Sequence, residues 1–356
     1  MKYFLLILFS LVTNIYASDL DKRVQKSYDQ MVSLNEKTLA DFPSGGQTIA
    51  VLNVNLGLLT GRLAYVPEYE TRKKHFIATL RAFLREKKVD FVFLQELWYE
   101  DDFKSVLKLA KEEGFLPALS ANDYSAKVSK IGMQILVRES ALAKGSKISE
   151  VNLSNYAKTT RLEYWGRYKR ALMSALVTLK VGRKVRLANT HLSATVGAND
   201  IRSAQVSEMT AQLKKLTAAK EVLLFGSDFN VSPEFEDALA GEVKQWEENR
   251  APYVNFFEAT HVVEAFKTLH PKDPGYTWDK RTNTLISDGP SVIKDEPLQR
   301  TDCIWVGIPE AKFEQAQLVA VVEEASLVFT KPTIPVGTKK VHLTDHFGNF
   351  AKIRVR

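Results

Sequence analysis

The sequence predicts a single α/β sandwich domain, in which two packed β-sheets form the core and helices cover the outer faces. Two observations support this fold class. Short runs of apolar and β-branched residues recur along the chain and are typical of buried strands. Some runs are joined by segments with helical spacing, and others by turns too short to hold a helix. This mixture fits a sheet-on-sheet core better than an all-parallel sheet, in which every strand needs a crossover connection.

The expected strands and helices follow one another over a continuous span. We expect strands in 47–55, 89–96, 131–137, on both sides of the turn at Gly182 and Arg183, in 221–230, in 301–308 and in 346–355. Helices are expected after Pro67, where Ile77, Leu80, Phe83 and Leu84 recur at helical spacing, and in 101–114 and 199–219. No repeat or linker divides this span, so one domain is predicted.

The composition restricts the class of protein. The 356 residues are 45% hydrophobic and 26% charged, which is enough apolar material for a sizeable core. The formal net charge of +7 favours polyanionic partners, and nucleic acids and anionic membrane surfaces both qualify. Cys303 is the only cysteine, which excludes an intrachain disulfide and a cysteine-rich metal site. Its expected role is core packing.

The N-terminal segment has the order of a secretory signal peptide. Lys2 precedes an apolar run from Phe4 to Val12, and small residues follow at Ala17 and Ser18. We therefore expect residues 1–17 to be a signal peptide and the protein to be secreted or periplasmic. A membrane anchor is the alternative, although the apolar run is shorter than the roughly 18 residues that a bilayer span needs. Residues 18–45 predict a helical extension that ends before Pro43, and residues 46–356 form the predicted domain.

Polar side chains able to bind metal or phosphate occur at the ends of five apolar strands. They are Asn53, Glu96, His191, the pair Asp228 and Asn230, and His346. Loops at strand ends present functional groups to one crevice in a layered fold, so these residues are candidates to converge. Taken singly, a carboxylate at a strand end is more often a surface charge than a ligand, and a lone histidine is more often structural.

Together these residue types fit the hydrolysis of a phosphodiester, which needs neutralised phosphate oxygens, an activated water and a stabilised leaving alkoxide. Mg²⁺ prefers oxygen ligands, and Glu96 is a reasonable one. Asp228 and Asn230 lie two apart in an extended segment, so one can orient or deprotonate water while the other donates to phosphate. His191 and His346 would complete the site, with Asp302 as an orienting carboxylate.

In this order the motifs resemble the endonuclease/exonuclease/phosphatase superfamily over nearly all of 47–356. They are LNVN with Asn53, FLQE with Glu96, NTHL with His191, GSDFN with Asp228 and Asn230, RTDCIWV with Asp302, and LTDHFG with Asp345 and His346. The resemblance implies a four-layered α/β sandwich of the deoxyribonuclease type, with two mixed sheets flanked by helices.

The resemblance also implies roles for individual residues. Catalytic roles fall to His191, Asp228, Asn230, Asp302 and His346, with His191, Asn230 and Lys169 as substrate-binding residues and Asn53, Glu96 and Asp345 at the metal. The implied cofactor is Mg²⁺, with Mn²⁺ or another divalent cation as alternatives. Two departures from the family pattern stand out: Arg170 replaces a small residue after Lys169, and the first motif, NVNLG, leaves Asn55 as an alternative to Asn53.

The motif spacing looks most like that of neutral sphingomyelinases. Arg202 and Gln205 match their Arg-x-x-Gln pattern, although a surface helix explains both residues equally well. The first hypothesis is therefore a secreted, sphingomyelinase-like phospholipase C that acts on sphingomyelin or a related phospholipid at a membrane surface. The second is a secreted deoxyribonuclease-type endonuclease with nucleic acid as substrate. A non-catalytic protein of this fold is disfavoured by the intact set of site residues, and no obligate protein partner is expected.

One aromatic segment allows two interpretations. Trp246, Tyr253, Phe256 and Phe257 would form a membrane-contacting surface if they were exposed. Core packing is the stronger expectation, because large aromatic side chains are usually buried.

Overall fold

A computed structural model describes residues 2–42, 45–60, 66–124, 131–160, 168–194, 197–217, 221–239, 241–289, 295–309 and 319–356, with side chains from residue 19 onward except that of residue 41. Two six-stranded mixed sheets form its centre. The first has the order β13 (Ala320–Val328), β16 (Gly348–Val355), β1 (Gln47–Leu58), β2 (Phe91–Leu97), β4 (Gln134–Arg138) and β3 (Phe115–Pro117). The second has the order β10 (Val263–Glu264), β12 (Asp302–Gly307), β8 (Val222–Asp228), β7 (Lys184–His191), β6 (Ala171–Thr178) and β5 (Ser149–Asn155).

Each sheet has one parallel pair at its centre. Strand β1 runs parallel to β2, and β7 runs parallel to β8, while the other neighbours in both sheets are antiparallel. The parallel pairs are connected through α2 (Tyr69–Glu86) and α5 (Asn199–Leu216), which serve as crossover helices. The carboxyl ends of β1 and β2, and of β7 and β8, therefore lie at a common edge of each sheet.

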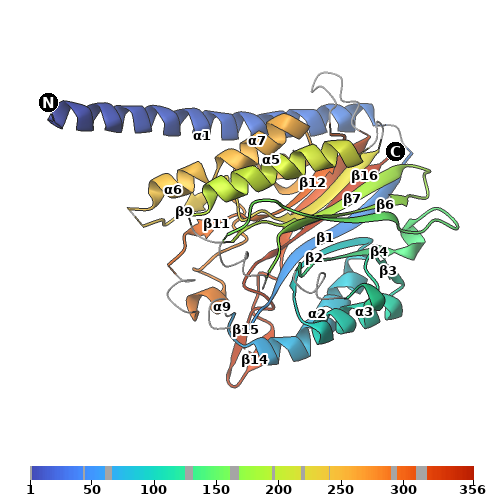
Figure 1. The fold of residues 1–356 in the computed structure, drawn as a ribbon. Helices are drawn as coiled ribbons and strands as arrows, with labels where there is room; N and C mark the ends of the chain where they lie inside the picture. Colours follow the sequence, from blue (N-terminus) through green and yellow to red (C-terminus); the bar gives the residue numbers. More distant parts are fainter. Residues whose placement is uncertain are drawn as a thin grey trace.

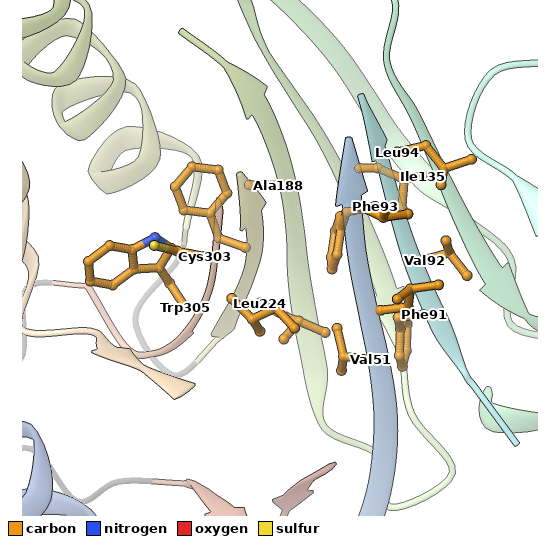
Figure 2. Packing of buried hydrophobic residues seen from close by; sticks show 14 of the residues in the cluster. Val51, Phe91, Val92, Phe93, Leu94, Ile135, Ala188, Leu224, Cys303 and Trp305 are labelled. Carbon is orange, nitrogen blue, oxygen red and sulfur yellow. The ribbon is translucent and has the colours of Figure 1, made fainter. Parts of the chain in front are cut away.

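The two sheets pack face to face through alternating apolar side chains. Val51 of β1 and Leu224 of β8 approach each other between the sheets, and Phe93 of β2 occupies the same layer (Figure 2). A Cβ built at Gly226 of β8 would lie 2.4 Å from the Phe93 side chain, so only glycine allows the sheets to meet this closely. Cys303 is fully buried in this core, as expected from the sequence.

Helices cover both outer faces and complete a four-layered sandwich. Helices α2 and α3 (Glu100–Glu112) lie on the first sheet, and α5 and α7 (Ala251–Thr260) lie on the second (Figure 1). The other short helices are α6 (Val243–Glu248), α8 (Ala265–Leu269), α9 (Thr284–Ser287) and the 3₁₀ helices η1 (Ala121–Asp123) and η2 (Glu139–Ala141). Two short ribbons pair β9 (Phe235–Glu236) with β11 (Leu298–Gln299) and β14 (Ile334–Val336) with β15 (Lys339–Val341). This arrangement confirms the predicted fold class.

Helix α1 (Lys2–Asp41) contains the segment predicted as an N-terminal extension. Its second half joins the core, because Tyr28 and Met31 are buried and Asn35 binds the backbone of Val322 through two hydrogen bonds of 2.8 and 3.1 Å. Arg23 also pairs with Glu258 of α7 at 2.7 Å. Among the described residues, the helices lack a stretch long and apolar enough to cross a membrane.

The aromatic segment is part of the core. Tyr253, Phe256 and Phe257 are fully buried and Trp246 is 4% exposed. Tyr253 and Phe256 pack against Trp305 of β12, with ring centroids 4.9 and 5.0 Å away. The alternative of a membrane-contacting surface at these residues is therefore wrong.

Candidate functional site

Strand register brings three predicted site residues together at one edge of the second sheet. Asp228 ends β8, His191 ends the parallel neighbour β7 directly opposite it, and Asp302 begins the antiparallel neighbour β12, also opposite it. His191 Nε2 lies 3.4 Å from Asp228 Oδ2. The convergence expected from the sequence is thus a direct result of strand pairing, because residues in register on adjacent strands lie side by side.

His346 joins this group from the loop before β16. Its Nδ1 lies 2.8 Å from Asp302 Oδ2 and 3.9 Å from Asp228 Oδ2. The ring of Trp278 packs edge-on against it, with centroids 5.0 Å apart. The Asp302 backbone is itself fixed, since Thr277 Oγ1 accepts a hydrogen bond from its amide and Asn349 Nδ2 donates to its carbonyl. Asp302 therefore orients the imidazole of His346, as predicted for an orienting carboxylate.

Asn230 lies on the other side of Asp228. Its amide donates to Asp228 Oδ1 at 3.0 Å, and its Nδ2 donates to the carbonyl of Leu192 at 3.1 Å. Its φ of 47° and the φ of 56° at Glu96 lie in the left-handed region. That conformation costs about 1 kcal/mol or more for a residue other than glycine, and such strain is concentrated at functional sites.

Glu96 and Asp345 form the acidic side of the site. Burial raises the pKa of Glu96 to about 7, with a further increase from the charges of Asp345 and Asp228 and an opposing effect from His346 and Arg170. The Asp345 carboxylate packs on Gly57 so closely that a Cβ there would lie 2.2 Å from Asp345 Oδ1. These mutual effects show that Glu96, Asp345 and Asp228 lie close to one another.

The two candidate asparagines of β1 have different environments. Asn53 is fully buried: its Nδ2 donates to the carbonyl of Ser227 at 3.0 Å, and its Oδ1 accepts from Gln95 at 2.9 Å. Asn55, two residues closer to the strand end, donates from Nδ2 to Asp228 Oδ2 at 2.8 Å. Asn53 therefore links the two sheets below the site, and Asn55 is the asparagine that reaches the site.

The electrostatics divide the histidines into two kinds. Burial lowers the pKa of His191 well below its usual value, and the charges of Arg170 and His346 lower it further, so His191 is neutral. Burial also opposes protonation of His346, but the carboxylates of Asp302 and Asp228 outweigh it and raise its pKa well above the usual value. Burial and the charge of Asp302 raise the pKa of Asp228 to about 6.

A cation and two aromatic rings border the site on the His191 side. The Trp98 ring lies 6.2 Å from the His191 ring and 4.7 Å from the Tyr168 ring, and the Arg170 guanidinium lies 5.9 Å from the Trp98 centroid. Arg170 is 7% exposed, and its charge acts on both Glu96 and His191. Lys169, predicted to bind substrate, is half-buried and makes no hydrogen bond or ion pair with the site in the described part of the chain. Arg170 is the better-placed cation.

Three further residues next to the site were not predicted from the sequence. Thr344 Oγ1 donates to the carbonyl of Asn55 at 2.7 Å, and Asn283 Nδ2 donates to the carbonyl of Asp345 at 3.0 Å. Glu296 lies close enough to His346, Arg202 and Asp345 for their charges to act on it, and burial raises its pKa to about 7. Asn283 and Glu296 lie outside the motifs, and Thr344 lies within LTDHFG without being singled out, because the role of each depends on a contact between segments far apart in the chain.

The donor set suits a divalent cation. Ligand atoms of Asp228, Asp302 and His346 lie within 4.8 Å of one another, and Asp302 Oδ1 is buried without a hydrogen-bond partner in the described structure. Carboxylate and amide oxygens dominate the surroundings, which is the chemistry that Mg²⁺ and similar hard cations prefer. A cation would also relieve the repulsion that raises the pKa of Glu96.

Comparisons with known proteins agree with this geometry. A search of curated protein sequences finds no match. Among solved structures, TDP2 from D. rerio complexed with a single-strand DNA product is similar with a TM-score of 0.59 and 19% identity, covering 86% of this chain and 99% of that one. The human Nocturnin catalytic domain with a bound sulfate has a TM-score of 0.55 and 20% identity, with coverages of 87% and 94%.

A mannosyl-6-phosphatase from Bacteroides thetaiotaomicron has a TM-score of 0.54 and 11% identity, covering 86% of this chain and 99% of that one. At these identities the structural matches establish the fold alone. The sequence profile described as the endonuclease/exonuclease/phosphatase family matches residues 50–287, which carry Asn55, Glu96, His191, Asp228 and Asn230. The chain therefore belongs to the endonuclease/exonuclease/phosphatase family.

Proposed function

We propose that the protein is a metal-dependent phosphodiesterase. One observation carries the proposal: His191, Asp228 and Asp302 lie in register on three adjacent strands, and His346 is hydrogen-bonded to Asp302 at 2.8 Å. A buried group of two carboxylates and two histidines is costly to fold, and shifted pKa values such as those of His191, Asp228 and His346 are concentrated at catalytic sites. A purely structural domain has no need of it.

We assign the cation to Glu96, Asp345 and Asn55. The side-chain oxygen of Asn55, Oδ1, accepts one hydrogen bond, from the Gly57 amide, and retains a second lone pair. Asp302 also offers its unpartnered Oδ1 to a cation, but we assign it to orienting His346, because its Oδ2 binds His346 Nδ1 at 2.8 Å. When bound, a divalent cation would polarise the phosphate and offset the negative charge that develops on its oxygens.

The side chains supply the remaining steps. Asp228 accepts a proton from a water molecule as the bond from that oxygen to phosphorus forms and the bond to the leaving oxygen breaks. Asn230 Nδ2 and the neutral His191 ring bind nonbridging phosphate oxygens. His346, held protonated by Asp302 and Asp228, stabilises the added charge of the transition state.

For the substrate, we propose a sphingomyelin-like phospholipid, cleaved in the manner of a phospholipase C. Support comes from the motif spacing and from the positive net charge of +7, which favours an anionic membrane surface. Nucleic acid is the second candidate, because the same charge suits a phosphate backbone and the D. rerio TDP2 structure holds a single-strand DNA product. The fold by itself does not determine whether the substrate is a phospholipid or a nucleic acid, so the substrate is decided by experiment.

We further propose that the protein is exported through cleavage of residues 1–17. Edman sequencing of the mature protein from the medium or periplasm should begin near Ser18, and an uncleaved N-terminus would contradict this.

The substrate experiment compares a phospholipid with a nucleic acid under the same conditions. Purified protein is incubated with Mg²⁺ and either sphingomyelin vesicles or plasmid DNA, and with EDTA in parallel. Release of phosphocholine without nicking would support the lipid substrate, whereas nicking without phosphocholine release would favour nucleic acid. Hydrolysis of neither substrate, nor of bis(4-nitrophenyl) phosphate, would contradict the phosphodiesterase proposal.

A further inference from the structure

Arg202 and Gln205 are buried residues of α5 and make specific contacts with the loop after His191. Arg202 is 2% exposed and Gln205 fully buried, so the surface-helix explanation of the Arg-x-x-Gln pattern is wrong. Gln205 accepts a hydrogen bond from the Ser193 amide at 3.0 Å and donates to Ser193 Oγ at 2.8 Å. Arg202 Nη1 donates to the Ser193 carbonyl at 2.9 Å. The chain is therefore fixed two residues beyond His191.

Arg202 also makes a second connection, through Asn249. Its Nε donates to Asn249 Oδ1 at 2.8 Å, and Asn249 Nδ2 donates to the carbonyl of Asn230 at 3.1 Å. Asn249 follows α6 and is 1% exposed. The Arg202 guanidinium thus contacts the loop after His191 directly. It contacts the loop that contains Asn230 through the side-chain amide of Asn249.

These contacts close into a ring. Asn230 Nδ2 returns to the Leu192 carbonyl at 3.1 Å, next to Ser193. Each hydrogen bond in this ring involves a buried or half-buried group. At such positions water is a poor replacement for a lost hydrogen bond. The Asn230 carbonyl, which accepts the hydrogen bond from Asn249 Nδ2, belongs to a residue with φ of 47°, a conformation that surrounding contacts must maintain.

We propose that Arg202 and Asn249 are positioning residues that hold His191 and Asn230 in register with each other. This inference rests on the proposed function, because it treats those two side chains as the phosphate-binding pair. Arg202 and Asn249 act on these two side chains through the backbone of Ser193 and Asn230. Hydrogen-bonded support of this kind keeps catalytic groups near the productive geometry, and an error of about 1 Å can cost about 100-fold in rate.

The sharpest variant is Asn249→Asp. The carboxylate keeps an acceptor for Arg202 but cannot donate to the Asn230 carbonyl, so only one bond of the ring is lost. With bis(4-nitrophenyl) phosphate and Mg²⁺, kcat should fall about 10- to 100-fold while KM changes by less than about 3-fold. The Mg²⁺ concentration for half-maximal activity should stay the same, since the ring does not include Glu96, Asn55 or Asp345. Arg202→Lys, which retains one donor, should lose less than Arg202→Ala.

Asn35→Ala is the matched control. Asn35 is a buried asparagine too and likewise makes two side-chain hydrogen bonds, but both go to the backbone of Val322 and join α1 to β13. Its removal should lower the unfolding midpoint without changing kcat. If Asn35→Ala and Asn249→Asp reduce kcat equally, the loss reflects general destabilisation and the inference is overturned.

Amide hydrogen exchange supplies a readout that needs no activity. In Asn249→Asp, exchange should accelerate in peptides covering 191–194 and 228–231, and in Asn35→Ala it should not. Unchanged exchange in both peptides of Asn249→Asp would overturn the inference. If the wild-type protein hydrolyses no diester, the proposed function fails, and this comparison still decides whether the ring holds the two loops.

Discussion

Asp228 is the residue on which the site converges, because five polar neighbours contact or flank its carboxylate. It accepts hydrogen bonds from Asn55 Nδ2 and the Asn230 amide, and it lies 3.4 Å from His191 and 3.9 Å from His346, with Asp302 opposite it in the sheet. Its position explains why its pKa is raised only to about 6 despite complete burial, since the hydrogen bonds and His346 favour the charged form.

Replacement of Asp228 by asparagine should abolish most of the activity. The amide has nearly the same size but cannot accept a proton from water, so kcat should fall by about 10²- to 10⁴-fold in a steady-state assay with bis(4-nitrophenyl) phosphate. Asp90→Asn is the control, because Asp90 also binds one backbone amide, that of Ala50, but lies outside the site. A rate near that of the wild type in Asp228→Asn would show that the chemistry has been misplaced.

The two asparagines of β1 can be separated by their response to Mg²⁺. Asn55→Ala should raise the Mg²⁺ concentration for half-maximal activity about tenfold or more, since it removes an oxygen at the proposed cation site. Asn53→Ala should instead lower the free energy of unfolding by about 1–3 kcal/mol, because Ser227 and Gln95 lose a buried partner. Titration of activity with Mg²⁺ and urea unfolding of both variants decide which asparagine lies at the cation. A raised Mg²⁺ requirement in Asn53→Ala and a loss of stability alone in Asn55→Ala would assign the cation to Asn53 instead.

At the scale of the element, α1 is a structural part of the domain. Met31→Ala should reduce the free energy of unfolding by about 2–5 kcal/mol, as for other fully buried side chains. Leu39→Ala on the same helix is the control, because Leu39 is 49% exposed and its loss should cost less than about 0.5 kcal/mol. Equal, small effects of both substitutions on urea unfolding would show that α1 is a dispensable extension.

Strands with long apolar runs were predictable from the sequence, and the polar edge strands were not. Strands β1, β2, β7, β8 and β12 combine apolar runs with a polar end, so both their positions and their site residues followed from the pattern. Strand β13 was missed because Glu323 and Glu324 interrupt its apolar residues, and β5 was missed because SEVNLSN reads as a polar loop. Both are edge strands: β13 pairs with β16, and β5 pairs with β6. No local sequence pattern predicts these pairings.

The sequence predicted which residues lie near the site, but it did not predict how their side chains contact one another. Asn53 and Asn55 point to the same face of β1, so only the packing of the second sheet distinguishes them. Arg202 was explained equally well as a surface residue, since its partners Ser193 and Asn249 lie in loops whose paths the sequence does not give. The sequence pattern does not predict the long-range hydrogen bonds between loops, which are therefore the part of the site that only the structure shows.

At the scale of the whole molecule, the acidic site makes the metal-free protein more stable at low pH. The pKa of Glu96 is raised from 4.5 to about 7, so between these values the folded protein holds a proton that the unfolded chain releases. The contribution of Glu96 to the free energy of unfolding is therefore present at low pH and is lost as the pH rises through 7. The raised pKa of His346 acts in the same direction.

In EDTA, urea unfolding should give a free energy at pH 6 that exceeds the value at pH 8 by on the order of 1 kcal/mol. Glu96→Gln should reduce this difference. Added Mg²⁺ should stabilise the wild type more at pH 8 than at pH 6, because the cation binds the deprotonated carboxylates. Equal stability of the wild type at the two pH values in EDTA would argue against a crowded acidic site.

The central claim is that the two sheets hold a site in which water attacks phosphorus with the help of a divalent cation. Hydrolysis of bis(4-nitrophenyl) phosphate in ¹⁸O-labelled water with Mg²⁺, followed by mass spectrometry of both products, tests it directly. We expect one ¹⁸O atom in the phosphate monoester, none in the nitrophenol, and no product with EDTA or with Asp228→Asn. Label in the nitrophenol, or undiminished hydrolysis in EDTA, would contradict the account.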